Sequence, residues 1–125
     1  MEDFFPGAYG GDYYVQKSHY LPNNPVFQKA NILHLHNLHG GYFNPWSLPL
    51  LSAVKPTVWT LHDMQALTGH CAHSLNCERW LPETQCGECQ SLSSYPHLWR
   101  DTTHQLWQDK CNIYAHSFLY LEVIS

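Results

Sequence analysis

Two short, mostly apolar runs constrain the fold of this chain more than any other feature. The first, NILHLHN, covers residues 31–37, and the second, TVWTLHD, covers residues 57–63. Short apolar runs that are bounded by Gly and Pro, as these are, predict strands buried on both faces of a sheet. Because a helical pattern lies between them, we expect the two strands to be parallel and joined by a right-handed crossover.

Helical patterns follow both predicted strands. Residues 44–54 contain apolar residues at helical spacing, behind an expected N-cap and a proline at the first helical position: Trp46, Leu50 and Val54 after Asn44 and Pro45. A longer amphipathic helix is predicted over residues 96–116, with an apolar face of Trp99, Leu106, Trp107, Ile113 and Tyr114. The closing residues 118–125 have the composition of a third strand.

The order of these elements predicts an α/β fold. Residues 1–30, rich in Gly, Pro, Asn and Tyr, are expected to form an irregular N-terminal segment. Residues 31–125 are expected to form a partial Rossmann-like domain, in which a cysteine-rich loop spans residues 67–94. The sheet looks cut after its third strand, because a doubly wound fold normally adds a covering helix and further strands.

Composition excludes several classes of function. A hydrophobic content of 44%, a charged content of 13% and a formal net charge of −4 describe an ordered globular chain. Six Lys and Arg residues without a basic block provide little of the positive surface that nucleic-acid binding requires. The chain has neither a secretion signal nor an apolar stretch long enough to span a bilayer. We therefore expect a cytoplasmic protein with no nucleic-acid partner and no transmembrane segment.

Both predicted strands end in a histidine that is followed by a polar residue. His36 and Asn37 follow the first strand, and His62 and Asp63 follow the second. Ligands of open α/β sheets bind beyond the carboxyl ends of the strands, so these four side chains should surround one crevice. A histidine there can exchange a proton near neutral pH, and the neighbouring carboxylate can orient its ring. Either histidine alone could simply cap its strand, but the repeated pair favours a functional site.

Two weaker signals lie close by. His34 and His36 share one face of their strand, and such a pair can hold a metal. The further ligands of a hydrolytic metal site are not visible, however. His39 precedes Gly40 and Gly41, where the backbone can approach a ligand closely.

Four of the five cysteines follow the pattern C-x5-C-x8-C-x2-C: Cys71, Cys77, Cys86 and Cys89. This spacing can bring four thiolates to one tetrahedral zinc ion, and His70 and His73 are conceivable substitutes. Two disulfides could link the same residues, although a reducing compartment favours zinc. With four sulfur ligands the zinc site would be closed, and hence structural. Cys111, within the last helix, is most simply a small core residue.

Together, the segments ANILHLHNLHGGYFN, KPTVWTLHDMQALTGHCAHSLNCERW and CGEC resemble the acceptor-side domain of family 4 glycosyltransferases, in the bacterial group related to capsule and exopolysaccharide synthesis. The resemblance extends from about Asp12 to the C-terminus. It implies a retaining enzyme of two Rossmann-like domains that transfers a hexose from a nucleotide-sugar to a saccharide or lipid-linked acceptor. It also implies peripheral membrane contact in the full-length enzyme.

The resemblance assigns roles to the residues at the strand ends. His62 matches the histidine that lies near the transferred sugar in that family, so His62 and Asp63 are the implied catalytic residues. The implied substrate-binding residues line the same cleft: His36, Asn37, His39, Gly40 and Gly41.

The chain also departs from the family pattern. It contains no pair of glutamates at the Glu-x7-Glu spacing, which binds the nucleotide-sugar in the second domain, and it lacks the opening strand with its glycine-rich loop. We therefore expect a fragment of the first domain that is inactive alone. The alternative is a stand-alone, zinc-stabilised module that binds a saccharide or a protein partner without catalysis.

Overall fold

The computed structural model describes residues 11–124. Residues 1–10 of the expected N-terminal segment and Ser125 of the expected third strand lie outside the described residues. The elements follow one another as 3-10 helices η1 (Gly11–Tyr14) and η2 (Lys17–Asn23), helix α2 (Pro25–Lys29), strand β1 (Leu33–Leu35), helix α3 (Ser47–Val54), strand β2 (Thr57–Leu61), helix α4 (Thr103–Ala115) and strand β3 (Leu119–Val123).

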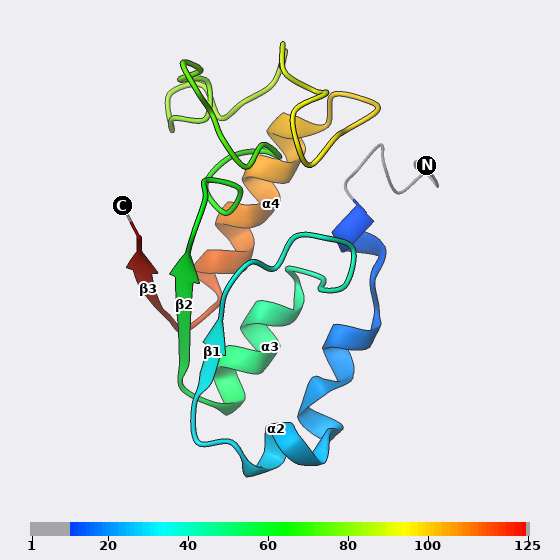
Figure 1. Cartoon of the computed structure of the whole chain (residues 1–125), viewed down its shortest axis with the longest axis vertical. Helices are drawn as coiled ribbons and strands as arrows, with labels where there is room; N and C mark the ends of the chain where they lie inside the picture. Colours follow the sequence, from blue (N-terminus) through cyan, green and yellow to red (C-terminus); the bar gives the residue numbers. More distant parts are fainter. Residues whose placement is uncertain (1–10, 125) are drawn as a thin grey trace.

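The three strands form one parallel sheet in the order β1-β2-β3 (Figure 1). Leu35 of β1 pairs with Trp59 of β2, and Trp59 pairs in turn with Leu121 of β3. Helices α3 and α4 connect successive strands and contact each other on one side of the sheet. The predicted strand-helix-strand unit with parallel strands is therefore confirmed. A small parallel sheet of this kind is compatible with a partial Rossmann-like fold.

The core lies between the sheet and the two crossover helices. Leu48 and Leu51 of α3 and Ile113 of α4 are almost completely buried, and they pack against Trp59 and Leu61 of β2. Of the predicted buried strands, the central strand β2 is therefore the one that is buried. The outer strands differ, because His34 in β1 and the residues of β3 after Leu119 are exposed at the edges of the sheet.

The apolar face predicted for the first helix is wrong. Trp46, Leu50 and Val54 are all exposed. The buried face of α3 instead combines Leu48 and Leu51 with two serines, Ser47 and Ser52, whose hydroxyls bond within the protein. Small polar residues with internal partners can occupy a buried face, which a hydropathy pattern does not detect.

Asn44 and Pro45 lie before this helix, but the predicted N-cap and first helical position are wrong, because α3 begins at Ser47 behind Trp46. The side-chain oxygen of Asn44 accepts a hydrogen bond from the Trp46 N–H at 2.9 Å, in a turn that precedes the helix. Its amide group donates to the carbonyls of Tyr13 and Val15. Asn44 is buried, and it therefore fastens the N-terminal part of the chain to α3.

Residues 11–29, which were expected to be irregular, form three short helices. Asn24 accepts a hydrogen bond from the Val26 N–H at 2.8 Å, and Pro25 occupies the first position of α2. The Asn-Pro pair thus begins a helix within the segment that was expected to be irregular. Phe27 of α2 belongs to the same hydrophobic cluster as the sheet, so this segment completes the core of the domain.

The last helix is shorter than the predicted range of residues 96–116, because α4 begins at Thr103. Asp101 accepts hydrogen bonds from the N–H and the hydroxyl of Thr103, which hold the turn that precedes the helix. Leu106 and Ile113 form its buried face, but Trp99 lies outside the helix and is exposed. Cys111, expected in the core, is exposed on α4.

The segment between β2 and α4 contains neither helix nor strand, and it covers residues 62–102. Among residues 11–124, no helix has both the length and the apolar character needed to span a membrane.

Gly69 of this long loop packs closely against Thr103 at the start of α4. A Cβ atom at residue 69 would lie 2.7 Å from the backbone oxygen of Thr103 and 2.8 Å from its Cβ. We expect Gly69→Ala to lower the free energy of unfolding by roughly 1–3 kcal/mol, because the first turn of a helix cannot easily move aside. Urea unfolding measures the change. Leu75→Ala, at an exposed position of the same loop, is the control and should change stability by less than about 0.5 kcal/mol. Equal stability of Gly69→Ala and wild type would contradict the close packing.

Candidate functional site

The carboxyl ends of β1 and β2 bring two of the predicted histidines into contact. His36 follows β1, and His62 follows β2. Nδ1 of His36 and Nε2 of His62 are 3.0 Å apart, so that one ring donates a hydrogen bond to the other. Both side chains are exposed. The pair therefore presents imidazole groups to solvent at the edge where ligands of parallel sheets bind.

Asp63 is held by a different histidine from the one expected. His39 donates a hydrogen bond from Nε2 to Oδ2 of Asp63 at 2.9 Å, and Oδ1 of Asp63 accepts from the N–H of Gln65 at 2.9 Å. The carboxylate that was expected to orient His62 thus orients His39. The other ring nitrogen of His39, Nδ1, is buried without a hydrogen-bond partner among residues 11–124, an uncommon state for a buried polar atom.

The glycine turn after β1 is occupied by a carboxylate from the N-terminal segment. The N–H groups of Gly40 and Gly41, at φ values of 143° and 86°, both donate to Oδ1 of Asp12. Burial raises the pKa of Asp12, and these two hydrogen bonds partly oppose that rise. Asn37 lies beside the turn, where its carbonyl accepts from the Tyr42 hydroxyl. Nothing in the sequence pattern pointed to Asp12, because it is distant from the turn along the chain.

His34 belongs to a hydrogen-bond chain that crosses the face of the sheet opposite the helices. Thr60 donates its hydroxyl hydrogen to Oε1 of Glu122 at 2.8 Å, so His34 must donate from Nε2 to the Thr60 oxygen, also at 2.8 Å. These two hydrogen bonds link β1, β2 and β3. His34 therefore uses one nitrogen to join the strands, and residues 11–124 contain no group of three His, Cys, Asp or Glu side chains that is already arranged to hold a metal.

Two aromatic side chains fix the backbone around the histidine pair. Trp59 donates from Nε1 to the carbonyl of His36 at 2.7 Å, and its ring lies edge-on to Tyr114 of α4 at a centroid distance of 5.8 Å. Tyr114 donates its hydroxyl to the carbonyl of Ala66 at 2.6 Å. Their positions in the apolar patterns of the strand and the helix predicted burial but did not indicate that they support the site.

Lys110 of α4 is a further supporting residue that the sequence analysis missed. Its ammonium group donates to the carbonyls of Gln65 and Thr68, in the loop that follows His62 and Asp63. Lys110 is buried, and burial lowers its pKa to about 8. A lysine within an amphipathic helix is normally a surface residue, so its sequence position gave no signal.

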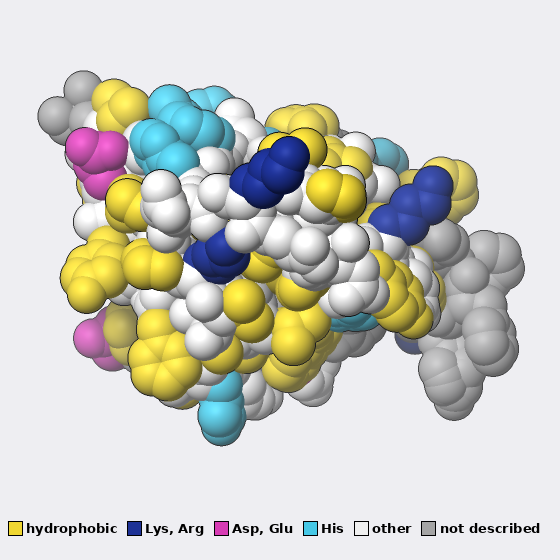
Figure 2. All heavy atoms as spheres, turned by 90° about the horizontal axis from the view of Figure 1, so that it is seen from below, with side chains coloured by type: hydrophobic (Ala, Val, Ile, Leu, Met, Phe, Trp, Pro, Cys, Tyr) yellow, Lys and Arg dark blue, Asp and Glu magenta, His cyan; other side chains and the backbone are white. Residues whose placement is uncertain are grey.

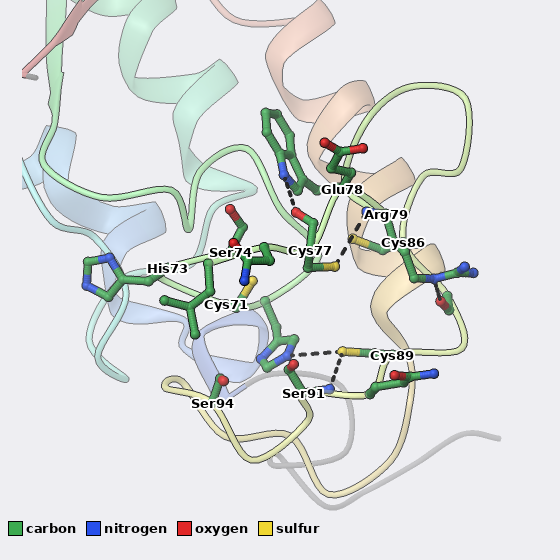
Figure 3. Close-up of a pocket in the computed structure, with 16 residues that line it drawn as sticks. Cys71, His73, Ser74, Cys77, Glu78, Arg79, Cys86, Cys89, Ser91 and Ser94 are labelled. Atoms are coloured by element: carbon green, nitrogen blue, oxygen red, sulfur yellow. Dashed lines mark hydrogen bonds between the residues drawn. The ribbon is translucent and has the colours of Figure 1, made fainter.

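The four patterned cysteines line one hollow of about 440 Å³, and Figure 3 shows their side chains around it. By contrast, the hollow at His36 and His62 measures only about 10 Å³. All four thiols are free and half-buried. Burial raises the pKa of the Cys86 and Cys89 thiols, so both are neutral near pH 7 and poorly suited to act as nucleophiles.

Comparison with known proteins identifies one relevant relative. Over 90 residues the chain is 37% identical to the putative colanic acid biosynthesis glycosyl transferase WcaC of Escherichia coli (strain K12). The aligned region covers 66% of this chain and 22% of that protein, so the chain spans about a fifth of the relative's length. No protein-family model matches the chain, and no solved structure matches it.

The burial of Lys110 predicts a distinctive dependence of stability on pH. Because its pKa falls from 10.5 to about 8 on folding, the unfolded chain binds the proton more tightly. Stability should therefore rise as the pH increases from about 8 towards 10.5, by up to roughly 3 kcal/mol. Urea unfolding of wild type and Lys110→Met at several pH values isolates this effect, since the thiols titrate in both proteins. Parallel pH profiles would contradict the prediction.

Proposed function

We propose that this chain is the acceptor-side part of a glycosyltransferase that acts in bacterial polysaccharide synthesis. The observation that carries the proposal is the 37% identity over 90 residues to the putative glycosyl transferase of E. coli. The small parallel sheet with histidines at its carboxyl edge is compatible with it. In its finer form, the proposal is a retaining enzyme of the family 4 type that transfers a hexose from a nucleotide-sugar to a saccharide or lipid-linked acceptor.

In this proposal the exposed His36–His62 pair contacts the sugar. The mutual hydrogen bond occupies one nitrogen of each ring and limits the rotation of both, so the neutral pair retains one donor and one acceptor for sugar hydroxyls. Asp63, held by His39 and by the Gln65 N–H, has a fixed direction beside them. Preorganised polar groups of this kind stabilise charge that develops on a sugar during transfer.

The proposal requires a second surface that faces this edge. A hollow of about 10 Å³ cannot enclose a sugar ring, whereas ligand pockets bury most of the ligand's surface. The groups that would bind the nucleotide diphosphate are also not evident, because the sequence contains no Glu-x7-Glu pair. We therefore expect these 125 residues to bind an acceptor but to transfer no sugar alone.

Peripheral membrane contact in the full-length enzyme is part of the proposal. The face shown in Figure 2 carries several basic side chains among hydrophobic ones, with acidic side chains at one side of the view. Residues 13–62 contain no Asp or Glu, but they contain Lys17, Lys29 and Lys55. Val26 of α2 and Val54 at the end of α3 are exposed. Cations beside exposed apolar groups suit an anionic lipid surface. The five free thiols suit a reducing compartment, so we place the protein in the cytoplasm.

A module that binds a saccharide or a partner without catalysis is the second candidate. The observation that favours it is the hollow lined by four thiols, which is far larger than the one at the histidine edge. Both candidates are compatible with saccharide binding, but only the first predicts that the histidine edge takes part in transfer within a larger enzyme.

Saccharide binding at the histidine edge is the first test. Titration calorimetry with short oligosaccharides from bacterial exopolysaccharides should detect binding to the wild-type chain. His62→Ala should weaken it about tenfold, because it removes a hydrogen bond to a sugar hydroxyl. His97→Ala is the matched control, since His97 is exposed, stacks on Trp99 and does not line the hollow at this edge. Lack of binding to every saccharide, or equal weakening by both substitutions, would refute the proposed acceptor site.

A further inference from the structure

The four cysteines of the long loop meet although they come from three separate places in it. Cys71 lies shortly after β2, Cys77 lies in the following turns, and Cys86 and Cys89 precede α4. All four line the same hollow, and their side chains surround it in Figure 3. The fifth cysteine, Cys111, does not line it. The fold thus brings together the four cysteines of the C-x5-C-x8-C-x2-C pattern and leaves Cys111 outside their hollow.

Backbone N–H groups point at three of these sulfur atoms. The N–H of Arg79 donates to Sγ of Cys77 at 3.4 Å, and that of Ser91 donates to Sγ of Cys89 at 3.3 Å. In both cases the donor lies two residues after the cysteine, so a tight turn follows each one. The third, from Gly69 to Sγ of Cys86 at 3.3 Å, comes from a distant part of the loop. Donors directed at sulfur stabilise thiolates, the form that binds metals.

The loop has little apolar packing to hold it together. Residues 62–102 contain neither helix nor strand, and the buried apolar residues in this range are few and mostly small: Ala66, Ala72 and Leu98. A loop of this length without regular structure is uncommon in a compact domain. Ordering its backbone costs about 1–2 kcal/mol per residue, which so few apolar contacts cannot offset.

The CGEC turn is also strained. Gln85, Cys86 and Glu88 have positive φ values of 60°, 59° and 48°, although none of them is glycine. Each such residue costs of the order of 1–3 kcal/mol and persists only where the surroundings hold it in place. A covalent or coordinate link through Cys86 and Cys89 would supply that restraint.

The buried charge of Lys110 is consistent with negative charge in the hollow. Both hydrogen-bond acceptors of its ammonium group are neutral carbonyls. Cys86 and Cys71 when ionised, and after them the carboxylates of Asp12 and Asp63, are close enough to favour the charged form of the lysine. A metal ion bound by four thiolates carries net negative charge, so it would compensate the cation that the fold buries beside it.

We propose that Cys71, Cys77, Cys86 and Cys89 together bind one structural Zn²⁺ ion, which fastens the loop of residues 67–94 to the start of α4. Sulfur is the ligand that zinc prefers in closed tetrahedral sites. Binding displaces the thiol protons and draws the four sulfur atoms inward, since no three of them are yet arranged as a coordination sphere within residues 11–124. The hollow of about 440 Å³ leaves room for the side chains to turn.

His70 remains outside the proposed ligand set. Its Nδ1 lies 2.7 Å from the carbonyl of Pro96 and therefore donates to it, while Nε2 lies 3.7 Å from Sγ of Cys89. In the neutral ring Nε2 then accepts from the Cys89 thiol, and the four cysteines already fill a tetrahedral coordination sphere without His70. Retention of zinc by His70→Gln is expected, and its loss would overturn the four-cysteine set.

The decisive experiment counts reactive thiols in the wild-type chain before and after chelation, alongside elemental analysis. We expect about one zinc per chain, rapid reaction of Cys111 alone before chelation, and reaction of all five thiols afterwards. Two disulfides would instead leave the count at one until a reductant is added, and unligated thiols would react at once. Either of these results refutes the proposal.

Substitutions then identify the ligands. Cys→Ser changes at residues 71, 77, 86 and 89 should each reduce bound zinc, whereas Cys111→Ser should retain it and serves as the matched control. If a ligand variant fails to fold, Co²⁺ titration of the metal-free wild type provides the second measurement. Absorption bands of a tetrahedral cobalt-thiolate complex support the site, and their absence at saturating Co²⁺ overturns it.

Discussion

The buried hydrogen bonds from α4 to the loop after β2 are the contacts on which the rest of the site depends. Residues 62–102 have no regular structure of their own, so the carbonyl groups that do not accept from within the loop need donors from elsewhere. Lys110 and Tyr114 provide them, to residues directly after His62 and Asp63. The positions of the polar side chains at the strand ends therefore follow from how α4 packs, and a change on the inner face of that helix would reach the site indirectly.

Trp59 holds the backbone at the end of β1, as Lys110 and Tyr114 hold the loop after β2. It contributes its ring to the core and its indole N–H to the carbonyl of His36, so one residue of β2 fixes both the packing and the neighbouring backbone. Asp12 closes the arrangement from the N-terminal side through the amides of Gly40 and Gly41. The histidine edge is thus held by three parts of the chain that are far apart in sequence, as expected of a preorganised site.

The sequence allowed the order of the main strands and helices, their parallel pairing and the meeting of His36 with His62 to be anticipated, because each depends on local pattern and on the geometry of parallel sheets. It did not reveal the inner face of α3, where Ser47 and Ser52 are buried through hydrogen bonds that no hydropathy pattern records. It also missed Lys110 and Asp12, whose burial depends on partners distant along the chain. Contacts of that kind depend on tertiary packing and produce no periodic pattern in the amino-acid sequence.

The three strands run away from the face that carries exposed apolar groups and lysines, and His36 and His62 lie beyond their far ends (Figures 1 and 2). A five-residue strand is roughly 16 Å long, so the histidine edge lies at one end of the sheet and that face at the other. Contact through either surface would therefore leave the other accessible.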